Sequence, residues 1–187
     1  MTTKQIKVKE ISRARLRAVA LWYLERYGGT RARVDQLLQR RIFKAEETHG
    51  VQGQAQAWKG QVLDELERLG LINDQAFAEA RVRKGLRQGR SQRHMAQDLA
   101  RAGVGKEVVE AAMGSQVENP AEAELHAARA YARQRRLGAY SRQDSEVFLL
   151  SDQERLAQER KDLARLGRRG FSYEIARRAL AGEEGEA

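Results

Sequence analysis

The chain has 187 residues, with 35 lysines and arginines against 26 aspartates and glutamates, which leaves a net charge of +9. A basic chain of this kind is attracted to polyanions, of which nucleic acid is the most common. It contains no cysteine, which excludes disulfides, thiolate zinc sites and cysteine nucleophiles. No apolar stretch reaches the length of a membrane span, and the first residues lack the apolar core of a signal peptide. We therefore expect an intracellular, cytoplasmic protein.

Helix formers such as alanine, leucine, arginine and glutamate dominate the chain, and they predict an all-α protein. After an N-terminal extension over residues 1–17, we expect a first three-helix repeat over residues 18–72. Thr30 is a candidate N-cap for its second helix, which carries one apolar stripe. Glutamine- and glycine-rich sequence over residues 44–60 indicates an insertion or long connection, with or without a short helix, and the third helix is expected from about Gln61.

A second three-helix repeat is predicted over residues 73–118 and a third over residues 119–181. Pro120 occupies the expected first position of a helix, where its missing N–H costs nothing. The other candidate N-caps are polar residues that precede apolar stripes, namely Asn73 or Asp74, Ser91, and Ser141 or Asp144. Residues 182–187 are acidic and glycine-rich, so we expect a disordered tail.

A short motif with the pattern leucine, any residue, arginine, any residue, glycine or isoleucine, then phenylalanine or valine occurs three times. The copies are Leu38–Phe43, Leu99–Val104 and Leu166–Phe171. Each copy is predicted to close an amphipathic helix, and the second and third lead into another helix with matching apolar positions. A recurring unit indicates a tandem array, which favours an extended binding surface over a single catalytic bowl.

Several of these segments resemble the RecX family. The similar segments are Ala20–Tyr27, Val62–Ala78, Ala100–Val104 and Arg168–Ile175. The resemblance covers about residues 18–181 and is weakest over residues 44–58 and 137–156, where this chain is longer. Helix–glycine–apolar junctions are common one at a time, but three of them in this order are much more specific.

The resemblance implies three tandem three-helix repeats in an elongated, curved molecule that regulates the RecA recombinase. Members of the family lodge in the groove of the RecA–DNA filament and modulate filament growth, ATP hydrolysis and strand exchange, with inhibition the expected direction. The resemblance thus implies a role in DNA repair, recombination and the SOS response. The expected partners are the RecA filament and DNA, touched directly or through the filament. No dimerisation device is evident in the sequence, and we expect a monomer.

Basic residues without interleaved acids are the candidates for the RecA- and DNA-binding surface, because they can neutralise phosphates. These are Arg81, Arg83, Lys84, Arg87, Arg90 and Arg93, then Arg129, Arg133 and Arg136, and finally Arg168 and Arg169. The second group belongs to an acid-free stretch that also contains Arg135 and Arg142. Arg83, Arg87 and Arg90 are spaced to lie along one face of a continuous helix. The alternative is a solvated flank whose aliphatic stems cover apolar surface.

The sequence does not indicate an enzyme. The three histidines lack the spacing of metal ligands, and no phosphate-binding loop is present, so we predict no catalytic residue, metal or cofactor. Ser91, His94 and Asp98 share a helical face, a combination of residue types that superficially suggests a catalytic triad. Ser91 is better explained as an N-cap, and the other two side chains as polar surface.

Aromatic residues fall mostly in apolar stripes or at the repeated motifs, and we expect most of these to lie in the core. They are Trp22, Tyr23, Tyr27, Phe43, Phe77, Phe171 and Tyr173. Trp58 and Tyr140 occur in segments expected to be irregular, and these two are predicted to be exposed.

Two other functions fit the same residues. An autonomous DNA-binding protein of the helix-turn-helix type would use residues 30–42 or 91–102 as a recognition helix. It would prefer a particular duplex sequence. A helical scaffold without nucleic-acid contact would instead show little sensitivity to salt.

Overall fold

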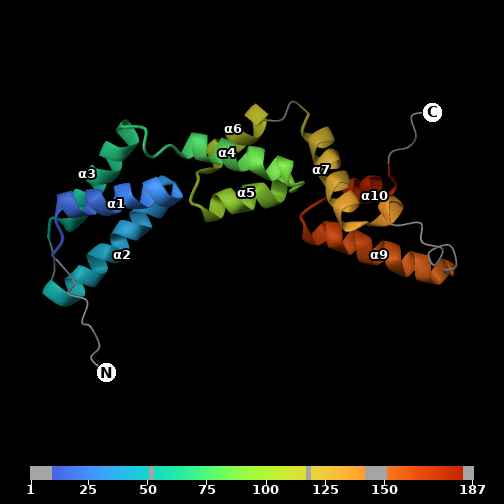
Figure 1. Ribbon diagram of the computed structural model, residues 1–187, viewed down its shortest axis with the longest axis horizontal. Coiled ribbons are helices and arrows are strands. Elements are labelled where there is room, and N and C mark those ends of the chain that lie inside the picture. Colours follow the sequence, from blue (N-terminus) through green and yellow to red (C-terminus); the bar gives the residue numbers. More distant parts are fainter. Residues whose placement is uncertain (1–9, 51–52, 117–118, 142–150, 183–187) are drawn as a thin grey trace, which may run out of the picture. The chain divides into compact units, whose positions relative to one another are not determined.

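The computed structural model describes residues 10–50, 53–116, 119–141 and 151–182. Over these residues every regular element is helical, and no strand occurs among them (Figure 1). The all-α prediction is therefore confirmed. The chain divides into two compact units. Unit 1 comprises Met1–Phe77 with Arg101–Gly105, and unit 2 comprises Ala78–Ala100 with Lys106–Ala187.

Unit 1 is built on α1 (Arg13–Tyr27), α2 (Arg31–His49) and α3 (Ala55–Arg68), which pack around one apolar core. The first helix begins earlier than residue 18, because Ser12 caps it and Leu16 is fully buried. The Thr30 side chain accepts a hydrogen bond from the backbone of the α2 N-terminus, which confirms the predicted cap.

The connection expected over residues 44–60 is helical for most of its length, and the third helix begins before the expected Gln61. Helix α2 continues to His49 and α3 already begins at Ala55. The physical reason is that the buried stripe of α2 does not stop at Ile42 but includes Ala45, which is also fully buried. Small apolar residues within the polar sequence thus extend both helices and pack against the core of unit 1.

The remaining helices are α4 (Asp74–Arg87), α5 (Gln92–Arg101), α6 (Lys106–Gln116), α7 (Pro120–Arg135), α9 (Asp152–Arg168) and α10 (Tyr173–Leu180), with a 3-10 turn at Gly138–Tyr140. Within unit 2, an apolar cluster joins α7, α9 and α10, and Leu166 and Ala179 are fully buried in it. Gly182 is also buried, so the predicted tail is ordered at its first residue, and residues 183–187 lie outside the described part.

Local caps agree with most of the predicted helix starts. The side chains of Asn73 and Ser91 accept hydrogen bonds from the backbone N–H groups of Ala76 and His94, at 2.8 and 3.2 Å. Pro120 occupies the first turn of α7, as predicted. Helix α9 is capped by Ser151, and the segment that Ser141 or Asp144 is predicted to cap lies outside the described residues.

The repeated motif ends a helix in two of its three copies. Gly103 and Gly170 adopt φ values of +80° and +87°, the left-handed region that favours glycine, and a new helix follows each. In the first copy the equivalent residue is Ile42, which is fully buried inside α2. A β-branched residue does not readily adopt that conformation, so the helix continues, and the expected end at Phe43 is wrong.

The aromatic residues are distributed differently from the prediction. Trp22, Tyr27, Phe43 and Tyr173 are exposed, with exposed fractions between 58% and 71%. Trp58 and Tyr140 are instead partly buried against the cores of unit 1 and unit 2. Membership of an apolar stripe or a repeated motif therefore did not decide burial, since Phe171 is buried while Trp22 and Phe43 are exposed within their helices.

Candidate functional site

Four predicted basic residues lie on the surface of α4. Arg81, Arg83, Lys84 and Arg87 are all exposed. Arg83 is 3.7 Å from Glu79 one turn earlier, an exposed ion pair that contributes little to stability. Lys84 and Arg87 form no ion pair with a described residue. Two cations of this helix are therefore available to an anionic partner.

Arg90 does not continue this face. Helix α4 ends at Arg87, and Gly89 then adopts a φ of +61°. Arg90 lies beyond this break and forms a 2.7 Å ion pair with Asp98 of α5. The continuous helix on which the alignment of Arg83, Arg87 and Arg90 depends is therefore absent, and the helix breaks near Gly89. The other residue of this group, Arg93, is exposed on α5.

Of the predicted arginines at 129, 133 and 136, the first two contact other residues of unit 2. Arg129 is half-buried and donates a 3.2 Å hydrogen bond to the carbonyl of Gly182. The guanidinium of Arg133 lies 5.3 Å from the centroid of the Tyr140 ring. Arg136 is the left-handed C-cap of α7, and its side chain is exposed. The neighbouring Arg142 lies outside the described residues.

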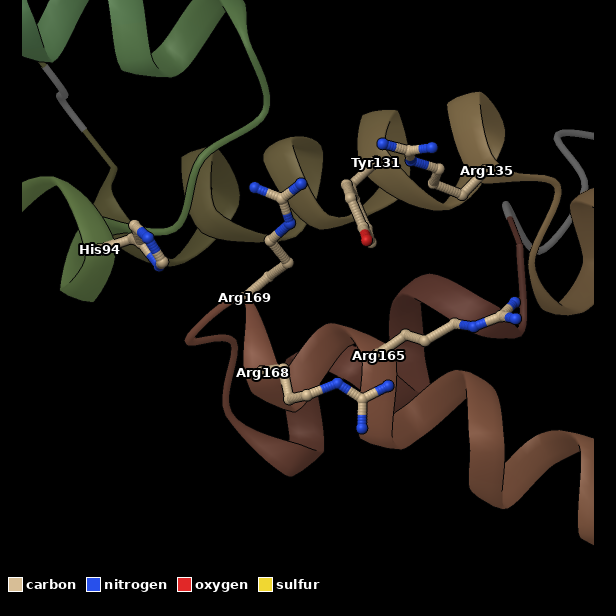
Figure 2. Close-up of a pocket in the computed structure, with 6 residues that line it drawn as sticks. All are labelled: His94, Tyr131, Arg135, Arg165, Arg168 and Arg169. Carbon is tan, nitrogen blue, oxygen red and sulfur yellow. The ribbon is translucent and has the colours of Figure 1, made fainter.

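The structure brings a different set of cations together in unit 2. A pocket of about 610 Å³ is lined by His94, Tyr131, Arg135, Arg165, Arg168 and Arg169 (Figure 2). Only Arg168 and Arg169 are among the predicted site residues. His94 belongs to α5, Tyr131 and Arg135 to α7, and the other arginines to α9 and its C-cap. We call these six residues the arginine pocket.

A hydrogen bond between the end of α9 and the start of α5 fixes one side of the arginine pocket. The Ser91 hydroxyl donates to the carbonyl oxygen of Arg169 at 2.5 Å and accepts from the backbone N–H of His94. The Arg169 guanidinium then lies 5.0 Å from the centroid of the Tyr131 ring, a cation–π contact. Figure 2 shows Arg169 between His94 and Tyr131, so one backbone contact positions several side chains of the pocket.

No acidic residue lines the arginine pocket. Arg165 lies 3.4 Å from Asp162, but that carboxylate is buried and also accepts hydrogen bonds from Gly138 N–H and Gln158. On α7, Glu124 accepts a 2.8 Å hydrogen bond from the backbone N–H of Gln92. Burial raises the pKa of Glu124 above its usual value of 4.5, although this hydrogen bond lowers it. The pocket therefore carries a concentrated positive charge.

The missed pocket residues have weak sequence signals. Arg135 belongs to the acid-free stretch but is not one of the predicted site residues, while Arg165 closely follows the acids Glu159 and Asp162 along the chain. Tyr131 stands in an alanine- and arginine-rich helix without a motif. The sequence pattern predicts His94 as a polar surface residue, and in the structure it lines the pocket. Only the spacing of Arg165, Arg168 and Arg169 on one helix end could have indicated a cluster.

The structure gives no support to a serine nucleophile. The Ser91 hydroxyl is buried and engaged at both its donor and acceptor positions, as a structural cap would be. Over the described residues, no group of histidine and acidic side chains is arranged to hold a metal ion. None of the helices in that part of the chain has both the length and the apolar content needed to cross a membrane.

Comparison with known proteins gives the family. Regulatory protein RecX of Myxococcus xanthus is 34% identical over 173 residues, which span 92% of this chain and 87% of that protein. The chain belongs to the RecX family. Regulatory protein RecX of Agrobacterium fabrum is 37% identical over 110 residues, or 59% of this chain and 52% of that protein. The family model for the second three-helix domain of RecX matches residues 73–113.

Solved RecX structures share the fold. The crystal structure of RecX from Lactobacillus salivarius has a TM-score of 0.63 at 18% identity, covering 90% of this chain and 94% of the other. A second crystal structure of regulatory protein RecX has a TM-score of 0.61 at 19% identity, covering 92% and 72%. The resemblance drawn from short sequence segments is confirmed, and so is the fold class of tandem helical repeats.

Proposed function

We propose that the protein binds the RecA–DNA filament and inhibits filament growth, ATP hydrolysis and strand exchange, thereby regulating DNA repair and recombination. The observation that carries this proposal is its membership of the RecX family, whose relatives bear the name regulatory protein. The sequence resemblance implies RecA as the target. The proposal includes that the protein is cytoplasmic and monomeric and that it has no enzymatic activity of its own.

The basic surfaces supply the physical means. A RecA–DNA filament carries DNA phosphates, and the arginine pocket and the exposed cations of α4 would be attracted to such a polyanion. A tandem array that occupies the filament groove would exclude the homologous duplex by steric overlap. It would also obstruct the addition of RecA subunits. Attraction and occupancy together account for inhibition without any catalytic residue.

We also propose that the repeats over residues 18–72, 73–118 and 119–181 are the building units of the array. The match of a three-helix domain model to residues 73–113 supports the second of them. The helices α1–α3, α4–α6 and α7 with α9 and α10 follow this order along the chain. Because the first helix begins at Arg13, we place the start of the first repeat at that residue rather than at residue 18.

The test is a titration of the protein into RecA filaments on single-stranded DNA while ATP hydrolysis is measured. We expect hydrolysis to fall at protein concentrations below that of RecA. The charge-reversal pair Arg83→Glu and Arg87→Glu should weaken this effect, whereas the pair Arg40→Glu and Arg41→Glu, exposed on α2, is the matched control. Hydrolysis that stays unchanged with an equimolar amount of protein would contradict the proposal.

The helix-turn-helix alternative is weakened by the surroundings of the candidate recognition helices. Such a helix contacts base edges with its N-terminal residues. At the start of α2, the backbone N–H of Arg31 donates to the Asp74 carboxylate at 2.9 Å. At the start of α5, the N–H of Gln92 donates to Glu124. A carboxylate at each N-terminus would repel DNA phosphates, which argues against insertion of either helix into a groove.

A further inference from the structure

We propose that the arginine pocket binds phosphate groups of a nucleic-acid backbone directly, so that the protein contacts DNA through its own side chains rather than only through RecA. The pocket joins His94, Tyr131 and four arginines within unit 2. The inference rests on the proposed function for one point, namely that the expected ligand is the DNA of the RecA filament. Its test uses DNA without RecA, so the two proposals can fail separately.

The first argument is that arginines from two helices line one pocket. Arg135 comes from α7, Arg165 and Arg168 from α9, and Arg169 from the end of α9. Figure 2 shows Arg169 and the Tyr131 ring in the space between α7 and α9, with Arg165 and Arg168 on the α9 side and Arg135 on the α7 side. A guanidinium offers parallel N–H donors that match the oxygens of a phosphate, and several of them can share one phosphodiester and its neighbour. The volume of about 610 Å³ holds more than a single small ion.

The second argument is that these cations are not neutralised. Arg135, Arg168 and Arg169 form no ion pair with a described residue. The Arg165 guanidinium lies 3.4 Å from the buried carboxylate of Asp162, and that carboxylate also accepts hydrogen bonds from Gly138 N–H and Gln158. Like charges gathered in one pocket repel each other, which is unfavourable unless an anion enters. A folded protein keeps such an arrangement most readily where a ligand uses it.

The third argument comes from the repeated motif, which shows what the fold itself requires. By their offsets from the N-cap serine or threonine and from the motif leucine, His94, Arg165, Arg168 and Arg169 correspond to Arg33, Asp98, Arg101 and Ala102. At the earlier motif the same hydroxyl-to-carbonyl bond forms, from Thr30 to Ala102. At the earlier motif, Asp98 stands at the position of Arg165 and Ala102 at the position of Arg169. The hydroxyl-to-carbonyl bond itself therefore forms without an arginine at either of these two positions.

A nucleic-acid backbone suits the pocket better than an acidic peptide. Phosphodiesters carry one charge at every step of the chain, so neighbouring phosphates can meet several arginines at once. Carboxylates on a peptide must be brought together by its own structure. The chain also carries a net charge of +9, which attracts an extended polyanion over a long distance.

The test measures binding of fluorescent oligothymidylate and of a duplex of equal length to the full chain at several salt concentrations. The pair Arg135→Gln and Arg168→Gln removes two exposed pocket cations. Its matched control is the pair Arg177→Gln and Arg178→Gln, exposed on α10 and absent from the pocket lining, with the same change in charge. Far-ultraviolet circular dichroism and the unfolding midpoint verify that both variants are folded.

We expect the pocket variant to lower the slope of log K against log salt by about 1.5, since each lost phosphate contact removes roughly 0.7 to 0.9. Its affinity at low salt should fall about tenfold or more, while the control keeps the wild-type slope. Equal losses in the two variants would overturn the proposal. Competition by polyglutamate as effective as by unlabelled oligothymidylate would also overturn it, and would assign the pocket to an acidic protein partner. A wild-type protein that binds DNA but does not inhibit RecA would instead count against the proposed function alone.

Discussion

The hydroxyl of Ser91 donates a hydrogen bond to the carbonyl oxygen of Arg169, 78 residues further along the chain. The hydroxyl of Thr30 forms the same bond to Ala102 at the earlier copy of the motif. In each case a helix N-cap also accepts from its own helix, so one buried hydroxyl links the start of a helix to the end of a later one. This shared contact is a feature of the repeat that no single helix reveals.

Replacing Ser91 by alanine should destabilise the fold more than replacing an ordinary N-cap. Ser91→Ala removes the cap of α5 and leaves the Arg169 carbonyl without its partner, for a loss of about 2 kcal/mol or more in the free energy of unfolding. The matched control is Ser172→Ala, because Ser172 is exposed and caps α10 only, and its loss should be about 1 kcal/mol. Urea denaturation measures both. Equal losses would show that the bond to Arg169 contributes nothing.

The glycine of the second motif copy should tolerate alanine poorly. A Cβ on Gly103 would lie 2.3 Å from the Cβ of Ala32, and its φ of +80° is unfavourable for any other residue type. Gly70 has a similar φ of +71°, but a Cβ at that position would have no neighbour within 4 Å. Gly70→Ala should therefore cost only the backbone strain, about 1 kcal/mol, and Gly103→Ala about 1 to 3 kcal/mol more. Thermal and urea unfolding of the two variants compares them, and a smaller loss for Gly103→Ala would contradict the packing at this junction.

The ion pairs of Glu65 should make unit 1 sensitive to acid. The hydrogen bond from Arg17 lowers the pKa of Glu65 below its usual 4.5, opposed by partial burial and assisted by the charges of Arg13 and Arg68. A lowered pKa in the folded state means that this stabilisation is present above pH 4.5 and is lost as the pH falls through the lower folded value.

Substitution tests that pH dependence. Glu65→Gln should lose stability at neutral pH and flatten the acid limb of the stability–pH curve, measured by urea unfolding between pH 3 and 7 (roughly the range over which carboxylates titrate). Glu159→Gln, at an exposed position on α9, should keep the wild-type limb. An unchanged limb in Glu65→Gln would remove Glu65 as its cause.

The two tryptophans should report opposite environments. Trp22 is 58% exposed at the surface of unit 1, and Trp58 packs against the core. Trp58→Phe leaves Trp22, whose emission should lie at long wavelength and be quenched readily by acrylamide. Trp22→Phe leaves Trp58, whose emission should be shifted to shorter wavelength and quenched less. The reverse order would restore the expectation drawn from the sequence pattern.

Features that depend on neighbours in the chain could be predicted from the sequence by itself. Helix content, the caps at Thr30, Asn73 and Ser91, and the position of Pro120 follow from local hydrogen bonding and apolar spacing. The family also followed, because three motifs in a fixed order are specific. Composition misled where polar residues surround a few decisive ones, as in the extension of α2 past Ala45.

Only the tertiary structure decided which cations meet. His94, Tyr131 and Arg165 come from three helices far apart in sequence, and their distance in space depends on how α5, α7 and α9 pack. The break at Gly89 is local, but the ion pair of Arg90 with Asp98 of α5 is a contact that only the folded structure shows. A run of arginines is visible in one dimension, whereas a binding pocket is set by side chains that long-range contacts such as Ser91 to Arg169 hold together.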